Sequence, residues 1–99
     1  MSKIGINDCV YFVHPIYDLY ASNGNGNVIH IIRKVPNERT KNNSGCMKCV
    51  VRKYGGKQKI YYVHRFVWEC FNGIMPEGKV IDHINNDKED NRLCNLHLV

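Results

Sequence analysis

The residue types best suited to chemistry gather near the carboxyl end of the chain. Asp82 and His83 follow the apolar pair Val80-Ile81, and Asn91 and Asn95 come shortly after. If Asp82 and His83 end a strand, their side chains point to opposite faces and can serve different ligands. A carboxylate and an amide oxygen suit a hard cation such as Mg²⁺, and a neutral histidine suits a general base. This combination predicts a phosphate substrate.

These residues also carry a resemblance to a known family. Three groups, Asp82-His83-Ile84-Asn85, Asp90-Asn91-Arg92 and Asn95-Leu96, resemble the HNH endonucleases with the ββα-metal (His-Me) finger. The likeness extends back to Tyr62-Val63-His64-Arg65 and to Pro76-Glu77-Gly78, as in phage and intron-borne members. It covers about the last forty residues.

The resemblance implies a role for each matching residue. His83 would take a proton from the attacking water, and Asp82 and Asn95 would hold one divalent ion, Mg²⁺ or Mn²⁺. Asn91 would brace the loop and orient His83. Because Asn95 stands where the name-giving motif has histidine, the chain resembles an HNN variant. The implied reaction leaves 5′-phosphate and 3′-hydroxyl ends on DNA.

Two other metal sites fit less well. A calcium loop counted from Asp82 fails, because Leu93 stands at the last position, where glutamate is needed. Cys46 and Cys49 have the spacing of half a zinc site, but no second such pair exists. On a strand they would also point to opposite faces. We therefore expect no structural zinc; a zinc-stapled domain and a non-cleaving DNA-binding module on an HNH scaffold remain alternatives.

One helix is predicted ahead of the motif. Val63, Phe66, Val67, Cys70 and Phe71 recur at helical spacing, and Gly73 ends the pattern. This face predicts a buried core with Cys70 inside it. On the same segment, Arg65 is expected either to contact phosphate or to pair with Glu69, and His64 either to cap the helix or to lie near the site.

The first half of the chain predicts β-structure. Asp8–Tyr20 and Val28–Val35 have the composition of strands, and the Asn-Gly run over residues 23–27 indicates a hairpin turn between them. Residues 37–45 are polar and predict an exposed loop. Cys46–Tyr54 and Lys57–His64, joined by Gly55-Gly56, predict a second hairpin.

Basic side chains concentrate on this second hairpin. A basic ribbon can contact DNA phosphates without reading sequence, which makes the hairpin a candidate DNA-binding element; its basic residues are Lys48, Arg52, Lys53, Lys57 and Lys59. Arg92 is a candidate phosphate clamp or an exposed arginine at the start of a helical turn.

Composition and charge fit this interpretation. The 99 residues carry a net charge of +5, and the acidic residues concentrate after residue 76. Such a length predicts a single domain, with a mainly β basic region over 1–62 and the helix and motif over 63–99. The predicted class is α+β: N-terminal β hairpins, one amphipathic helix and a C-terminal ββα-metal motif.

Several further expectations concern context. No apolar run reaches the ~18 residues of a membrane span, so we expect an intracellular protein, of phage or viral origin by the resemblance. The odd cysteine number predicts reduced thiols. One motif cuts one strand, so a double-strand break would require a homodimer or a second binding event. Family members commonly continue beyond the motif, so the end at Val99 is compatible with a minimal nuclease or with a truncated one.

Overall fold

An antiparallel sheet forms the amino-terminal part of the computed structural model, which describes residues 2–6, 8–36, 39–41, 45–53 and 55–99. Its five strands pair in chain order: β1 (Lys3–Ile6), β2 (Cys9–Val13), β3 (Tyr20–Ser22), β4 (Ile29–His30) and β5 (Val35–Pro36). The hairpin turn predicted over residues 23–27 is confirmed, since Tyr20 pairs with His30 across it. The strand predicted over Val28–Val35 is wrong, because a turn at residues 31–34 divides it into β4 and β5.

A second sheet contains the basic hairpin. It has three strands in chain order: β6 (Arg39–Lys41), β7 (Met47–Arg52) and β8 (Gln58–Tyr62). The predicted hairpin around Gly55-Gly56 is confirmed by the pairing of Arg52 with Gln58, although Tyr54, at its predicted edge, lies outside the described residues. The loop predicted over residues 37–45 contains β6, because backbone pairing with β7 stabilises a strand there; residues 37–38 and 42–44 lie outside the described residues.

The helix α1 (Val63–Asn72) follows β8 directly and is the single α-helix among the described residues. Its apolar face is buried as the spacing predicts, with Val63, Phe66, Val67 and Cys70 all at 0% exposure. These side chains pack against Val51, Tyr61 and Leu96 in the main core. Burial of a Phe or Val side chain stabilises by about 1.5–3 kcal/mol, so this face fixes the helix on both sheets.

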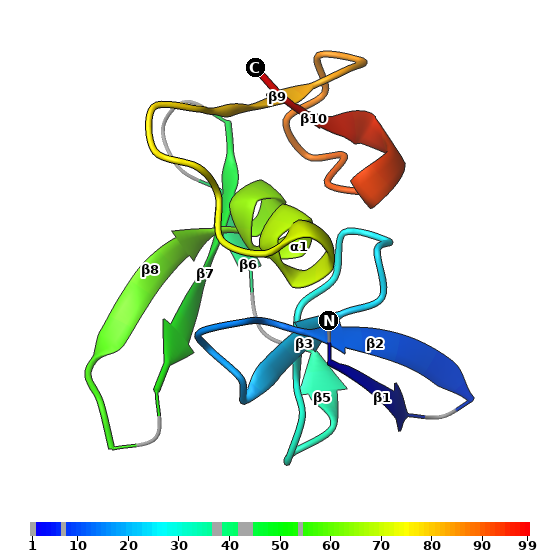
Figure 1. The fold of residues 1–99 in the computed structure, drawn as a ribbon, viewed down its shortest axis with the longest axis vertical. Coiled ribbons are helices and arrows are strands. Elements are labelled where there is room, and N and C mark those ends of the chain that lie inside the picture. The colour runs from blue at the N-terminus through cyan, green and yellow to red at the C-terminus, as the bar shows by residue number, and fades with distance from the viewer. Residues whose placement is uncertain (1, 7, 37–38, 42–44, 54) are drawn as a thin grey trace.

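The carboxyl-terminal strands lie above the helix at one end of the molecule (Figure 1). β9 (Ile81–His83) pairs antiparallel with β10 (Leu96–Leu98), and a 3₁₀ turn over Leu93–Asn95 leads into β10. The predicted mixed class is confirmed as a small domain with one helix and several antiparallel sheets among the described residues. None of the helical segments described is long or apolar enough to cross a membrane.

Candidate active site

His83 ends β9 with its side chain turned into the protein. Along this strand Asp82 is exposed and His83 only 6% exposed, as strand alternation predicts. The pairing of His83 with Leu96 places the imidazole over the start of β10. The strand therefore separates the two predicted chemical groups onto different sides.

Asn91 holds the His83 ring. The Oδ1 atom of Asn91 lies 2.8 Å from Nε2 of His83, and Asn91 is 2% exposed. The tautomer that fits this contact carries its proton on Nε2 and donates it to Asn91, which leaves the lone pair on Nδ1. The interaction predicted for Asn91, orientation of the histidine, has a direct geometric basis in this bond.

His64 packs against His83 from the first turn of α1. The ring centroids of His64 and His83 are 5.1 Å apart in an edge-to-face arrangement. The Tyr62 ring stacks on the His64 ring, with the two centroids 5.4 Å apart. Burial, together with the charges of His83 and Arg65, lowers the pKa of His64 to about 4. His64 is therefore neutral near neutral pH. The sequence left open whether His64 caps the helix or lies near the site, and its contact with His83 supports the second alternative.

Two buried atoms beside His83 keep hydrogen-bonding capacity. Nδ1 of His64 and Nδ2 of Asn91 have no hydrogen-bond partner among the described residues. Buried polar atoms are otherwise almost always satisfied, and exceptions concentrate where a ligand or water binds.

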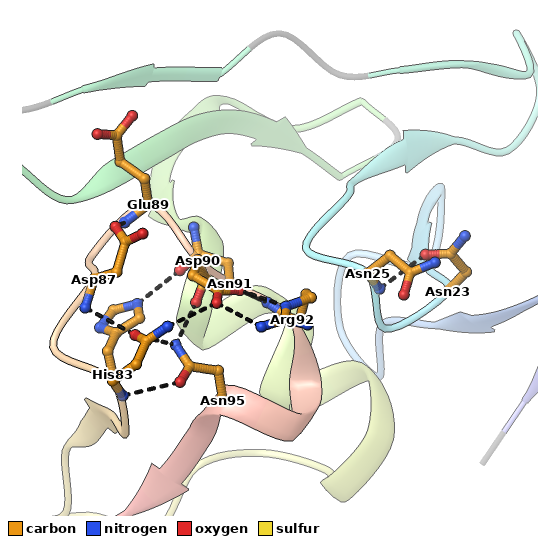
Figure 2. Close-up of polar contacts among 10 residues, drawn as sticks. Asn23, Asn25, His83, Asp87, Glu89, Asp90, Asn91, Arg92 and Asn95 are labelled. Carbon is orange, nitrogen blue, oxygen red and sulfur yellow. Dashed lines mark hydrogen bonds and ion pairs between the residues drawn. The ribbon is translucent and has the colours of Figure 1, made fainter.

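Asn95 braces the loop between β9 and the 3₁₀ turn. Its Oδ1 accepts the backbone N–H of Asn85 at 3.0 Å, and its Nδ2 donates to Asn85 Oδ1 and to the Asp90 carbonyl. Figure 2 shows these contacts converging beside His83. The amide of Asn95 is thus used on both ends to fix the loop that carries Asn91.

Asp82 lies on the exposed side of β9. Its Oδ2 atom is 3.1 Å from Nε2 of His97, its partner across the strand pair. Asn95, by contrast, is 6% exposed, and its side-chain oxygen accepts the Asn85 N–H inside the loop. Sequence reasoning missed His97, whose position opposite Asp82 depends on the strand register.

The exposed carboxylate of Asp82 is the kind of ligand that a hard cation accepts. No cluster of three or more His, Cys, Asp or Glu side chains among the described residues is arranged to hold a metal. Mg²⁺ is commonly held by one or two carboxylates plus water and substrate phosphate, so the exposed Asp82 fits such an ion. Asn95 as the second ligand stays a prediction; its oxygen accepts one hydrogen bond and keeps a second lone pair.

The Asn-Gly loop supports the site from the other sheet. The Leu93 N–H donates to the Gly24 carbonyl at 2.8 Å, and Asn25 forms a β-bridge with Arg92. A Cβ at Gly26 would lie 3.1 Å from the Asn91 carbonyl carbon, so only glycine allows this approach. The turn signal was recognised in the sequence, but its role as a support for Asn91 was not.

Glu69 links the helix to the strands around it. Its side chain is 0% exposed and accepts hydrogen bonds from His14 at 2.9 Å and from the Tyr61 hydroxyl. It also accepts the Met75 N–H at 2.9 Å, which fixes the start of the segment leading to β9. Sequence reasoning did not identify this buried carboxylate; the only signal was its place beside the apolar stripe of α1.

Opposing effects set the charge state of Glu69. Burial by itself would raise the pKa of Glu69, but the hydrogen bonds from His14, Tyr61 and Met75 outweigh it and lower the value to about 2. The carboxylate is therefore ionised at neutral pH.

Two of the candidate DNA-contact arginines, Arg65 and Arg92, are engaged in ion pairs. Arg65 lies 3.3 Å from Glu69, with its side chain 43% exposed, so the predicted salt bridge is present. Arg92 makes two 2.8 Å contacts with Asp90 and lowers the pKa of that carboxyl well below its usual range. Both guanidinium groups keep exposed surface through which a phosphate could be contacted.

The basic residues of the hairpin distribute over its two faces and its turn. Lys48 and Arg52 alternate with the buried Cys49 and Val51 on β7. Lys59 lies across from Val51, with its ammonium 5.7 Å from the Tyr61 ring. Lys53 and Lys57 flank the turn. The predicted basic ribbon is therefore present but presents its charges in more than one direction.

Two comparisons with known proteins find similarity to HNH endonucleases. The family model for HNH endonucleases matches residues 61–99. A solved structure, reported as DNA binding and cleavage by the HNH homing endonuclease I-HmuI, is similar over 90% of this chain with a TM-score of 0.79 and 29% sequence identity. The match covers 51% of that chain, so this chain spans about half its length. A comparison with curated proteins gives no match.

Proposed function

This chain is a member of the HNH endonuclease family, matched over residues 61–99, and from that premise we propose that it is a metal-dependent DNA endonuclease that hydrolyses phosphodiester bonds. The observation that carries the proposal is the 2.8 Å contact between His83 and Asn91. It fixes the imidazole in the tautomer that leaves Nδ1 free to accept a proton.

In the proposed reaction, His83 acts as the general base that activates the attacking water. Nδ1 of His83 takes a proton from water as the water oxygen forms a bond to phosphorus. The bond from phosphorus to the 3′ oxygen breaks, and that oxygen leaves as a hydroxyl after taking a proton from solvent. The products carry 5′-phosphate and 3′-hydroxyl ends. Asn91 keeps the ring oriented through the reaction.

A divalent ion, Mg²⁺ or Mn²⁺, would supply charge stabilisation on the phosphate and on the departing oxygen. Asp82 would hold it, with Asn95 as the proposed second ligand. The exposed position of Asp82 leaves room for phosphate oxygens in the ion's shell. Positive side chains at Arg65, Arg92 and the basic hairpin would contact the DNA backbone.

A non-cleaving DNA-binding module is the second candidate function. It is supported by Asn95, whose side-chain oxygen already accepts the Asn85 N–H inside the loop. Metal-dependent cleavage of DNA distinguishes the two candidate functions.

The test is cleavage of supercoiled plasmid with Mg²⁺ or Mn²⁺, against an EDTA control. We expect nicking that requires metal and is abolished in His83→Ala. Asp82→Asn should raise the metal concentration needed, whereas Glu77→Gln, an exposed carboxylate on the turn before β9, should behave as wild type. DNA binding without any metal-dependent cutting by the intact chain would refute the nuclease and support the binding module.

A further inference from the structure

A second basic feature lies away from the candidate active site. An open cleft of 480 Å³ separates the β4–β5 turn region from the β7–β8 hairpin. His30 and Arg33 contribute from the first side, and Arg52, Lys53 and Gln58 from the second; we call it the hairpin cleft. The free end of the hairpin and the β4–β5 turn lie at the opposite end of the molecule from β9 (Figure 1).

Among the described residues, no carboxylate lines the hairpin cleft to balance its positive charge. Arg33, Arg52 and Lys53 line it together. None of the salt bridges formed within the described residues involves these three cations, whereas Arg65, Arg92 and Lys41 all have acidic partners. Cations gathered in a concavity focus a positive potential and attract an anion.

The neutral donors of the cleft also suit an anion. The backbone N–H of Arg33 donates to Nδ1 of His30 at 3.3 Å, so the His30 ring carries its proton on Nε2. Burial and the Arg33 charge lower the pKa of His30, which keeps the ring neutral and leaves it a hydrogen-bond donor. Gln58 adds an amide. Two guanidinium groups, an ammonium and two neutral donors therefore line one cleft.

We propose that the hairpin cleft binds a backbone phosphate of the DNA, as an anchor separate from the site around His83. Arginine forks match phosphate oxygens, and the volume exceeds that of a lone phosphate but admits a phosphodiester with its sugars. This rests on the proposed function, because it takes DNA as the ligand. The longest extent of the molecule is 32 Å. At ~3.4 Å per base pair, a duplex along it would place the anchor up to about nine base pairs from the cut.

The test measures DNA binding rather than cleavage. Fluorescence anisotropy in EDTA, with the full chain and a duplex of about 24 base pairs, gives the affinity and its salt dependence between about 50 and about 250 mM salt. We expect Arg33→Gln and Arg52→Gln each to weaken binding about five- to tenfold and to reduce the salt slope by about 0.9. Lys34→Gln is the matched control: it removes the same charge one residue along, outside the cleft lining, and should weaken binding less than about twofold.

Equal effects of Arg33→Gln, Arg52→Gln and Lys34→Gln on affinity and slope would overturn the anchor, because they would show only a general charge effect. Titration with inorganic phosphate tests whether the cleft binds a free phosphate ion instead of a DNA phosphate. Phosphate binding that Arg33→Gln abolishes, with DNA affinity unchanged, would replace DNA by a free phosphate ligand. Because binding is measured in EDTA, it can be measured even if the chain does not cleave DNA. Conversely, if the cleft does not bind DNA, the cleavage experiment with His83→Ala still tests the proposed nuclease.

Discussion

Replacement of Glu69 by glutamine tests whether the buried carboxylate fixes the elements around the site. The change keeps the shape of the side chain but turns one oxygen into an amide that donates. The remaining oxygen can serve the side of His14 and Tyr61, where two donors meet. The amide then faces the N–H of Met75, which loses its acceptor.

The expected cost follows from these contacts. An N–H left without an acceptor costs about 1–3 kcal/mol, and two charge-assisted hydrogen bonds that become neutral lose about 1 kcal/mol each. Arg65 adds little, because its side chain is 43% exposed. The sum is about 3–5 kcal/mol. The lowering of the Glu69 pKa from 4.5 to about 2 gives a similar figure, about 3 kcal/mol.

Urea unfolding at neutral pH measures this loss. The single tryptophan, Trp68, packs against the core and reports unfolding by fluorescence, with circular dichroism as a second probe. Small domains are stable by about 5–15 kcal/mol, so Glu69→Gln should shift the midpoint strongly or prevent folding. Arg65→Gln, which removes only the exposed partner, should cost less than about 1 kcal/mol. If Glu69→Gln also costs less than about 1 kcal/mol, the network does not stabilise the fold as argued.

Three further predictions concern the site. Asn91→Leu removes the acceptor for His83 at similar volume, so cleavage should slow about ten- to hundredfold while the Kd for DNA changes less than about twofold; an unchanged rate would deny Asn91 its orienting role. Gly26→Ala should cost about 1–3 kcal/mol more than Gly55→Ala in thermal unfolding, because both have positive φ but only Gly26 contacts Asn91; equal costs would mean that the contact yields easily. The folded-state pKa of His64 is lowered to about 4, so the unfolded chain binds the proton first and stability should fall as pH drops from about 6.5 to about 4. His64→Phe should lose that part of the pH dependence in urea unfolding, and an unaltered profile would contradict it.

Local patterns in the sequence predict much of the fold. The helix over Val63–Asn72 follows from apolar spacing, because one face of a helix must be buried to be stable. The hairpin at Gly55-Gly56 follows from turn chemistry. The break between β4 and β5 was not predicted, since residues 28–35 contain no glycine, proline or asparagine to signal a turn, and strand pairing stabilises it.

The candidate site, like the fold, is only partly predictable from local sequence. The residue types at Asp82, His83 and Asn91 suggested the proposed chemistry, and strand alternation alone predicts that the first two face apart. The sequence does not show which atoms meet. The hydrogen bonds of the Asn95 amide with Asn85 and with the Asp90 carbonyl were not predicted, because they depend on how the loop folds back over the 3₁₀ turn.

What the sequence by itself determined is thus the resemblance to the HNH endonucleases, the helix, the hairpins and the candidate reacting groups, all of which depend on neighbours within a few residues. The tertiary structure alone decided the contacts between distant segments. It brought Gly26 against Asn91 and His14 against Glu69, and it placed Arg33 and Arg52 in the lining of one cleft. Those contacts depend on how the two sheets pack on one helix, and packing is a property of the whole chain that no local pattern encodes.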